Sequence, residues 1–312
     1  MANLAEDLFG ALYIQAFIAS ILYGITTLQA FFYSQTYRKD PVFLKCYVAI
    51  VWILETVHTA FCIQFAYAYL VRNFGNFEYF MTINWGIGAS GMLICGTLTA
   101  LMVQAFYVRR VYILSNCNMY LTAFITFFML SIFGFAVMFV TLTWMYPTWM
   151  GLKMHIPPGT TALSLISAVT VDVSIVVTLM WILIRKRHGI PENTKTAVDW
   201  ILLYLVNTGA LTAACRIISV ILYTTQKDNL AFLGVQEIQG KLYANSFLGS
   251  LNTRSFIRRK VEEHPSLETT RDGAAGAPME IFHQTEVITD AWNDESSQNR
   301  STRSIKGSDT VV

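Results

Sequence analysis

The sequence predicts an all-α membrane protein: a seven-transmembrane-helix bundle with its N-terminus outside, its C-terminus cytoplasmic and a disordered C-terminal tail. Two observations predict this fold, namely long uncharged apolar segments and basic residues in every second connection between them. Of the 312 residues, 54% are hydrophobic and 13% are charged, whereas a soluble domain carries about 25% charged residues. A soluble protein so poor in charge could not cover its surface with polar groups.

The few charges are bunched, and long uncharged stretches remain between them. Residues 8–37, 79–108 and 111–152 contain no Asp, Glu, Lys or Arg. A helix needs about 20 apolar residues to cross the hydrocarbon core of a bilayer, so each stretch is long enough. Backbone groups in hydrocarbon must find their hydrogen bonds within the chain, so each crossing segment is expected to be helical.

The predicted helices have ends defined to within a few residues. They cover about residues 10–33, 44–70, 82–107, 119–144, 161–184, 198–224 and 230–252. We expect one transmembrane domain over residues 1–260 and a cytoplasmic tail over residues 261–312. The tail is rich in small, polar and acidic residues and has few large apolar ones, which predicts disorder.

The seventh predicted helix is the most polar. It contains Gln236, Glu237, Gln239 and Lys241. Such a segment can cross a membrane only if its polar face is buried against other helices.

The orientation follows from the Lys and Arg residues in the connections. The connections after the first, third and fifth helices and the segment after the seventh lie on one side of the membrane and carry thirteen of these residues: Arg38, Lys39, Lys45, Arg109, Arg110, Arg185, Lys186, Arg187, Lys195, Arg254, Arg258, Arg259 and Lys260. The other side has three: Arg72, Lys153 and Lys227. Because cytoplasmic loops carry the excess of basic residues, the richer side is predicted to be cytoplasmic.

Six ionisable residues fall inside the predicted helices. They are Glu55, His58, Asp172, Arg216, Glu237 and Lys241. Each costs about 2.5–3.5 kcal/mol on insertion, so each requires a physical reason. Three acids face two permanent bases and a histidine, and the set neutralises itself if the helices meet in one buried polar core. Arg216 is expected to pair with Glu237 or Asp172.

Glu55 and His58 are three residues apart and therefore share a helix face. Paired Glu-x-x-His motifs bind metal in di-iron bundles, but this chain has one such motif and no second histidine in a predicted helix. A hydrogen-bonded pair between helices is favoured, and a proton relay is an alternative because histidine titrates near neutral pH.

The five cysteines predict neither a disulfide framework nor a metal site. They are Cys46, Cys62, Cys95, Cys117 and Cys215. They are scattered, odd in number, mostly in apolar segments, and without a Cys-x-x-Cys pair. We therefore interpret them as small packing residues.

Glu237 and Lys241 are four residues apart, in the order that favours a salt bridge within one helix. A lysine in the middle of a seventh helix, one turn after an acid, also resembles the retinal site of microbial rhodopsins. In that family the lysine forms a Schiff base and the acid belongs to its counterion. Those proteins have a further carboxylate in the third helix, and residues 82–107 contain none.

Several motifs resemble a large family of seven-helix membrane proteins in basidiomycete fungi, described as a domain of unknown function. The motifs lie at residues 23–26, 40–41, 55–58, 104–112, 207–212, 241–246 and 251–254, and the resemblance covers roughly residues 8–260. It implies seven helices and no particular activity. The family pattern has a small or apolar residue at the position of Arg216.

No nucleophile–base pair, P-loop or dinucleotide fingerprint occurs in a usable context, so we expect no enzyme and no cofactor. The leading hypothesis is a receptor-like or sensor protein that binds a small apolar or amphipathic ligand between its helices. Its expected partners are the lipid bilayer and a cytoplasmic protein that recognises the tail, without nucleic acid. The alternatives are a small-solute or proton-linked transporter, a structural membrane-organising protein, and a retinal-binding protein through Lys241. Plasma membrane and endomembrane are both compatible with the sequence.

Overall fold

The computed structural model describes residues 2–76, 79, 87–115, 117–157, 159–187, 192–225 and 231–263. The α-helices are α1 (Ala2–Thr36), α2 (Val42–Tyr67), α4 (Ile87–Leu114), α5 (Met119–Met145), α6 (Trp149–His155), α7 (Thr160–Arg187), α8 (Glu192–Thr225) and α9 (Ala231–Glu263). A short π-helix, η1 (Ala68–Arg72), continues α2. Within the described residues the protein is all-α and has no β-strand.

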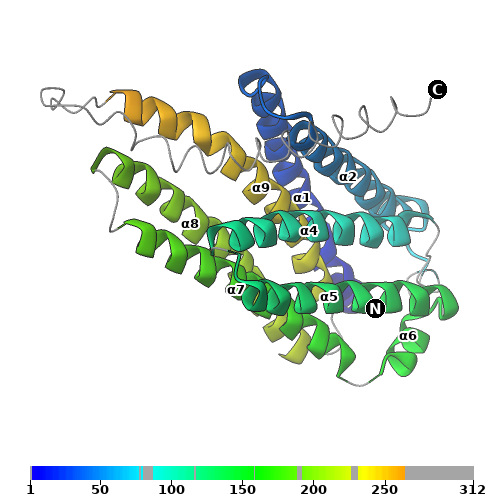
Figure 1. The fold of residues 1–312 in the computed structure, drawn as a ribbon. Coiled ribbons are helices and arrows are strands. Elements are labelled where there is room, and N and C mark those ends of the chain that lie inside the picture. The colour runs from blue at the N-terminus through cyan, green and yellow to red at the C-terminus, as the bar shows by residue number, and fades with distance from the viewer. Residues whose placement is uncertain are drawn as a thin grey trace, which may run out of the picture.

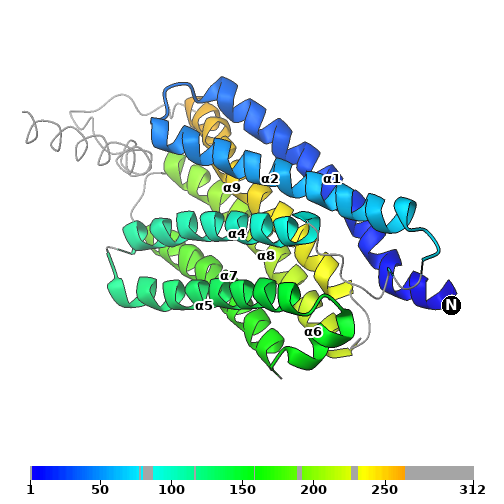
Figure 2. The ribbon, with the colours of Figure 1, turned by 90° about the vertical axis from the view of Figure 1, so that its right-hand side faces the viewer.

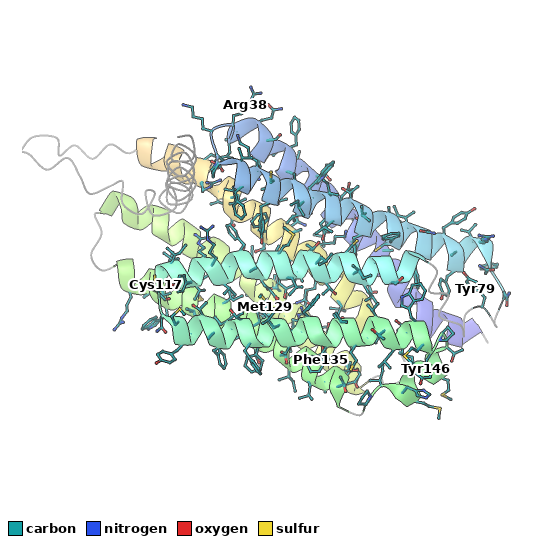
Figure 3. The ribbon with its side chains drawn as sticks, turned by 45° about the vertical axis from the view of Figure 1, so that its right-hand side comes forward. Arg38, Tyr79, Cys117, Met129, Phe135 and Tyr146 are labelled. Carbon is teal, nitrogen blue, oxygen red and sulfur yellow. The ribbon has the colours of Figure 1, made fainter. Side chains whose placement is uncertain are left out.

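The long helices form one bundle with α9 at its centre (Figure 1). Helix α9 packs against α1, α8, α4 and α2, whereas α5 packs against α4 and α7 at the opposite side of the bundle (Figure 2). Figure 3 shows Arg38 and Cys117 at one end of the bundle and Tyr79 and Tyr146 at the other. The α1–α2 and α4–α5 connections, which both carry basic residues in or beside them, therefore lie at one end.

Each of the seven predicted ranges contains one long helix, although the boundaries differ. Helix α9 ends at Glu263, well past the predicted end at 252 and three residues into the range predicted as tail. Two short elements were not predicted, η1 and α6. Helix α6 begins in the proline-containing connection because the Thr148 hydroxyl accepts a hydrogen bond from the Gly151 backbone N–H at 3.1 Å. The rest of the tail, residues 264–312, lies outside the described residues.

Six helices are long and apolar enough to cross a membrane. The qualifying segments are Ile14–Thr36, Val42–Tyr67, Ser90–Leu114, Met119–Met145, Thr160–Arg185 and Thr208–Thr225. Helix α5 illustrates why they need lipid: in its 27 residues only Ile125 and Thr143 are buried, and Phe127 is 67% exposed. In water, so much exposed apolar surface would drive association. The chain is therefore a multi-pass membrane protein whose apolar helices face the bilayer.

Helix α9 is not among these six segments because polar residues recur through it. Its 33 residues span about 50 Å, which exceeds the thickness of a bilayer core. Its surroundings are protein on most sides, and Gln239, Lys241 and Ala244 are all at most 1% exposed. The polar face of α9 is thus buried against other helices, as the sequence analysis required for a crossing helix.

A repeated contact holds α9 against α1. The Asn245 amide donates to the Leu22 carbonyl at 3.0 Å, and the Asn252 amide donates to the Gln29 carbonyl at 2.9 Å. Both pairs advance by seven residues, so the two helices run parallel and keep one seam in contact over two turns. Beyond this seam, Arg254 donates to Asp40 at 2.7 Å, so α9 also contacts the α1–α2 connection.

The apolar core fills the end of the bundle that contains the α1–α2 connection. Val103, Val111 and Phe247 are fully buried there, and the Phe106 and Phe247 rings meet edge-to-face with centroids 4.9 Å apart. These residues belong to a cluster formed by α1, α2, α4, α5, α7 and α9. The buried polar groups and the larger cavity lie toward the other end.

Candidate functional site

Two groups of buried polar side chains lie on neighbouring faces of α9. The first, the Lys241 cluster, consists of Glu55, His58, Thr59, Cys62, Glu237 and Lys241. The second, the Asp172 cluster, consists of Asp172, Arg216, Gln239 and Tyr243. All six ionisable residues singled out in the sequence fall into these clusters, which are two separate groups rather than one.

Lys241 and Glu55 form the most deeply buried ion pair of the described residues. Their side chains are 0% and 1% exposed, and the Lys241 Nζ lies 2.7 Å from the Glu55 Oε2. The same ammonium donates to the Thr59 hydroxyl at 2.7 Å and to the Glu55 backbone carbonyl at 3.2 Å. The ammonium therefore contacts three oxygen atoms, all of them from α2.

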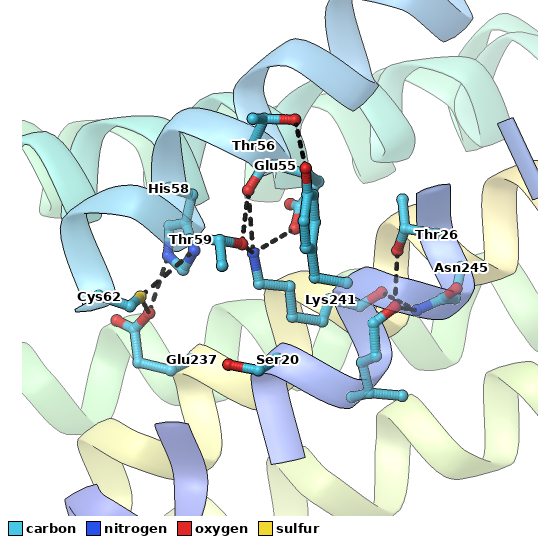
Figure 4. A network of polar contacts seen from close by, with 12 residues as sticks. Ser20, Thr26, Glu55, Thr56, His58, Thr59, Cys62, Glu237, Lys241 and Asn245 are labelled. Carbon is cyan, nitrogen blue, oxygen red and sulfur yellow. Dashed lines mark hydrogen bonds and ion pairs between the residues drawn. The ribbon is translucent and has the colours of Figure 1, made fainter. Parts of the chain in front are cut away.

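An aromatic ring covers this ion pair from the side of α1. The Lys241 Nζ lies 5.6 Å from the centroid of the Tyr23 ring, within the range of a cation–π contact. The Tyr23 hydroxyl is 3.0 Å from the Thr56 hydroxyl, so the ring is held on α2. Figure 4 shows Thr59 and Glu55 around the end of the lysine side chain, and Thr56 farther away. Three helices, α1, α2 and α9, thus enclose one positive charge.

One turn along α9, Glu237 contacts His58 rather than Lys241. The His58 Nε2 and the Glu237 Oε2 are 2.8 Å apart. On the other side of the ring, the Cys62 Sγ lies 3.6 Å from the His58 Nδ1 and 3.9 Å from the Glu237 Oε2. Figure 4 shows these three side chains converging between α2 and α9.

The predicted salt bridge between Glu237 and Lys241 within α9 is therefore wrong. Each of the two residues pairs with α2 instead, Lys241 with Glu55 and Glu237 with His58. The physical reason is that α2 offers a histidine and an acid three residues apart, which match the acid and the lysine four residues apart on α9. Two interhelical contacts replace one contact within a helix.

The Asp172 cluster joins α7, α8 and α9. The Tyr243 hydroxyl lies 2.6 Å from both carboxylate oxygens of Asp172 and donates to that group. The Arg216 Nε lies 3.5 Å from the Asp172 Oδ2, and its Nη2 donates to the Tyr243 oxygen at 3.2 Å. The Gln239 amide donates to Asp172 at 3.4 Å and to the Thr212 carbonyl at 3.3 Å. Of the two partners expected for Arg216, the structure pairs it with Asp172.

A cavity of about 180 Å³ lies between the two clusters. His58 and Glu237 reach it from the Lys241 cluster, and Arg216, Gln239 and Tyr243 reach it from the Asp172 cluster. Most of the remaining wall is apolar and comes from α4, α5 and α7: Met92, Leu93, Ala100, Leu101, Ile132, Phe135, Ala136, Met138, Phe139, Val140 and Leu165. A cavity of about 150 Å³ accommodates benzene, so this one has room for a small organic molecule.

A second, smaller cavity of about 40 Å³ lies next to the first. It is bordered by Asp172, Gly209 and Ser246, and shares Gln104 and Tyr243 with the larger cavity. Gly209 allows α8 to lie close to α7, because a Cβ at this position would be 2.3 Å from the Val176 side chain. The smaller cavity thus lies between the larger cavity and the apolar core, with Ile175 and Leu179 of that core in its wall.

Several residues of the site were not found by sequence reasoning. Cys62 was interpreted as a packing residue, and Gln239 and Tyr243 were noted without a role in the site. Their spacing could have indicated that they act together, because Gln239 and Tyr243 are four residues apart on α9 and so share a helix face. Thr59 follows Glu55 by the same spacing on α2, and its hydroxyl donates to the Glu55 carbonyl at 2.7 Å.

One protein-family model matches the chain. It is the family of unknown function DUF6534, and the match covers residues 168–256. This region contains Asp172, Arg216, Glu237 and Lys241, and it comprises most of α7 together with α8 and nearly all of α9. The predicted resemblance to a family of unknown function is supported over this part, whereas a fungal origin stays a prediction. No curated protein matches the chain, and no solved structure does.

Proposed function

We propose that the protein is a receptor-like membrane protein that binds a small amphipathic ligand in the larger cavity. The observation that carries this proposal is the cavity itself, which lies between two charged clusters and whose remaining wall is mostly apolar. Binding sites of this kind combine a mainly apolar wall with a few placed polar groups. Its volume of about 180 Å³ suits a ligand of roughly benzene size with one polar substituent. The proposed role is not enzymatic.

The proposal includes seven crossing helices, with α9 as the seventh. Its support is the length of α9 and the burial of its polar face, since a polar helix crosses a membrane only when protein surrounds it. The basic residues at the end of the bundle with Arg38 support a cytoplasmic location for that end. The cavity would then lie in the outer half, where an extracellular or lipid-borne ligand has the shorter route.

A ligand in the cavity would contact the groups that hold three helices together. Arg216 lines the cavity, and its guanidinium also pairs with Asp172 of α7 and Tyr243 of α9. A ligand that offers Arg216 an acceptor competes with those partners and changes the relative free energies of two helix arrangements. Since α9 leads directly to the tail, such a change reaches the cytoplasmic side.

The experiment uses thermal unfolding of the purified full chain in nanodiscs, with a panel of phenols, short alcohols and small carboxylic acids as probes. We expect at least one probe to raise the unfolding temperature of the wild type. Ala136→Phe, which places a ring in the cavity, is expected to abolish this shift. Val137→Phe is the matched control, because Val137 is the next residue of α5 and is 50% exposed on the outer face.

A stabilisation that persists in Ala136→Phe, or the absence of any stabilisation across the panel, would contradict ligand binding in this cavity. A separate experiment tests whether ligand binding changes the arrangement of the helices. It uses a fluorophore on Cys46, which is exposed near the start of α2. Two results together would contradict a receptor function: a probe that binds without changing the Cys46 fluorescence, and a deletion of residues 264–312 that has no phenotype. The protein would then bind a ligand without transmitting a signal.

A second candidate function, a proton-linked carrier, is favoured by the smaller cavity. Asp172 and Ser246 lie at the wall of this cavity, and His58 lies at the wall of the larger cavity. A carrier would depend on Asp172 and His58 for proton transfer. Proteoliposome flux of a probe that is unaltered by Asp172→Asn and His58→Gln would count against it.

The geometry gives less support to retinal binding through Lys241. The ammonium points into α2 and is bonded there to Glu55 and Thr59, and Lys241 is not among the residues that line the larger cavity. We expect no red-shifted absorption band after incubation with retinal. A purely structural membrane protein is the remaining alternative, and in that case substitutions in both clusters would change stability and nothing else.

A further inference from the structure

We propose that His58, Cys62 and Glu237 form a binding site for a transition-metal ion such as Zn²⁺. One nitrogen, one sulfur and one carboxylate oxygen from these side chains all lie within 4.8 Å of one another. The inference rests on this juxtaposition alone and is independent of the proposed ligand. Neither the isolated Glu55/His58 motif nor the scattered cysteines predicted it.

The helix geometry explains why the three donors meet. His58 and Cys62 are four residues apart on α2, the spacing at which two metal ligands lie on one face of a helix. Glu237 approaches from α9, which packs against α2. The seam between the helices is fixed one turn away by the Lys241–Glu55 ion pair, with its N–O distance of 2.7 Å. The donors therefore come from two helices whose relative position is already set.

Coordination through the His58 Nε2 requires the Cys62 Sγ to move, because the sulfur now lies beside the Nδ1 at 3.6 Å in a group of donor atoms within 4.8 Å of one another. Bond lengths of about 2.0–2.3 Å place the donors of a tetrahedral zinc ion about 3.3–3.7 Å apart. The His58 Nε2 and Glu237 Oε2 are now closer, at 2.8 Å, and the Cys62 Sγ and Glu237 Oε2 are slightly farther apart, at 3.9 Å. An ion would replace the His58–Glu237 hydrogen bond and draw the sulfur inward.

The donor set selects the class of metal. Imidazole nitrogen, thiolate sulfur and carboxylate oxygen are the three ligand types that zinc accepts in proteins. Hard cations such as Mg²⁺ and Ca²⁺ prefer oxygen donors, so a site with sulfur and nitrogen disfavours them. We therefore infer that the site binds a divalent ion between hard and soft, such as Zn²⁺. Co²⁺ can replace it for spectroscopy.

Charge balance also fits a buried site. On binding, the Cys62 S–H bond breaks, an S–metal bond forms, and the thiol proton leaves through the cavity to water. The proton between the His58 Nε2 and Glu237 also leaves that nitrogen, so the imidazole coordinates through Nε2 with its single ring proton on Nδ1. The thiolate and the Glu237 carboxylate then offset the two charges of the ion, while His58 coordinates as a neutral ligand. Because the adjacent Lys241–Glu55 pair is itself neutral, no net charge is left in the low-dielectric interior.

The site has an open side toward the larger cavity. His58 and Glu237 both line that cavity, and the neighbouring residue of α4 is Gly96. A Cβ at Gly96 would lie 3.3 Å from the His58 Nε2, so the glycine leaves free space beside the proposed coordinating atom. A three-ligand zinc site needs such an open position for water or another fourth ligand.

The test is a Co²⁺ titration of the purified, metal-stripped full chain in detergent, followed by absorbance. We expect one Co²⁺ per chain, with visible d–d bands and a near-ultraviolet thiolate-to-cobalt charge-transfer band. Cys62→Ser is expected to abolish the charge-transfer band, and Glu237→Gln to weaken binding at least tenfold. Cys46→Ser is the matched control, because Cys46 lies on the same helix but is exposed and away from the cluster.

A wild type without the charge-transfer band, or a band that survives Cys62→Ser, would overturn the site. If Cys62→Ser yields no folded protein by gel filtration, X-ray absorption of the zinc-loaded wild type decides the question. A single sulfur scatterer at about 2.3 Å with nitrogen or oxygen neighbours supports the site. A shell of oxygen and nitrogen without sulfur contradicts it.

Discussion

The two ion pairs on α9 differ in their access to the larger cavity. Lys241 and Glu55 are enclosed by α1, α2 and α9 and line neither of the two described cavities, whereas Arg216 is paired with Asp172 and also lines the larger cavity. The side chain of Arg216 is 11% exposed and that of Lys241 is 0% exposed. A charge enclosed by helices holds those helices together, while a charge at a cavity wall can also contact a ligand. The difference in exposure predicts that breaking the two ion pairs lowers the free energy of unfolding by different amounts.

Breaking the enclosed pair should give the largest loss of stability. Glu55→Gln or Lys241→Met leaves one buried charge without its partner and should lower the free energy of unfolding by about 3–5 kcal/mol. The double variant Glu55→Leu/Lys241→Met, which removes both charges, should recover most of that loss. Unfolding in mixed micelles with increasing denaturing detergent measures all three. Single variants that cost less than about 1 kcal/mol would show that the pair is not enclosed.

Breaking the cavity-facing pair should cost less. Asp172→Asn leaves Arg216 without its counter-charge, but water in the cavity can solvate the guanidinium, so we expect a loss of about 1–3 kcal/mol. Tyr243→Phe, which removes only the hydroxyl between them, should cost about 1–2 kcal/mol. The same unfolding assay applies. A loss for Asp172→Asn as large as that for Glu55→Gln would remove the distinction between the two pairs.

The smallest effect is expected for Thr56→Val, which is compared with a substitution of Thr59 on the same helix. Thr59 accepts a hydrogen bond from the enclosed Lys241 ammonium at 2.7 Å, whereas Thr56 contacts the Tyr23 hydroxyl at 3.0 Å in a half-buried position. Thr59→Val should cost about 1.5–3 kcal/mol, because hydrogen bonds to charged groups are the stronger ones. Thr56→Val should cost about 0.5–1.5 kcal/mol. Equal losses would mean that the lysine does not depend on Thr59.

The positions of the helices were predictable because membrane insertion depends on local properties of the chain. Uncharged stretches such as 111–152 and basic residues such as Arg109 and Arg110 required no knowledge of the partners. The cost of a charge in hydrocarbon likewise identified Lys241 and Asp172 as residues that need partners. Both conclusions require only the sequence of a single segment, without knowledge of its neighbours in the fold.

The pairing of the residues was not predictable in the same way. Which face of α9 meets α2 depends on side-chain packing between helices, and the spacing of Glu237 and Lys241 fits either a contact within α9 or two contacts to α2. Cys62 looked like a packing residue because its neighbours on α9 are distant in sequence. The seam between Asn245 and Leu22 joins residues 223 positions apart, and only the fold brings these together.

The central claim is that α9 crosses the membrane as a seventh helix with its polar face enclosed by protein. The most direct test places a protease-cleavable tag at each end of the full chain in oriented vesicles and measures access from one side. An odd number of crossings predicts that only the N-terminal tag is cleaved from outside and only the C-terminal tag from the cytoplasmic face. Cleavage of both tags from the same side would contradict a seventh crossing.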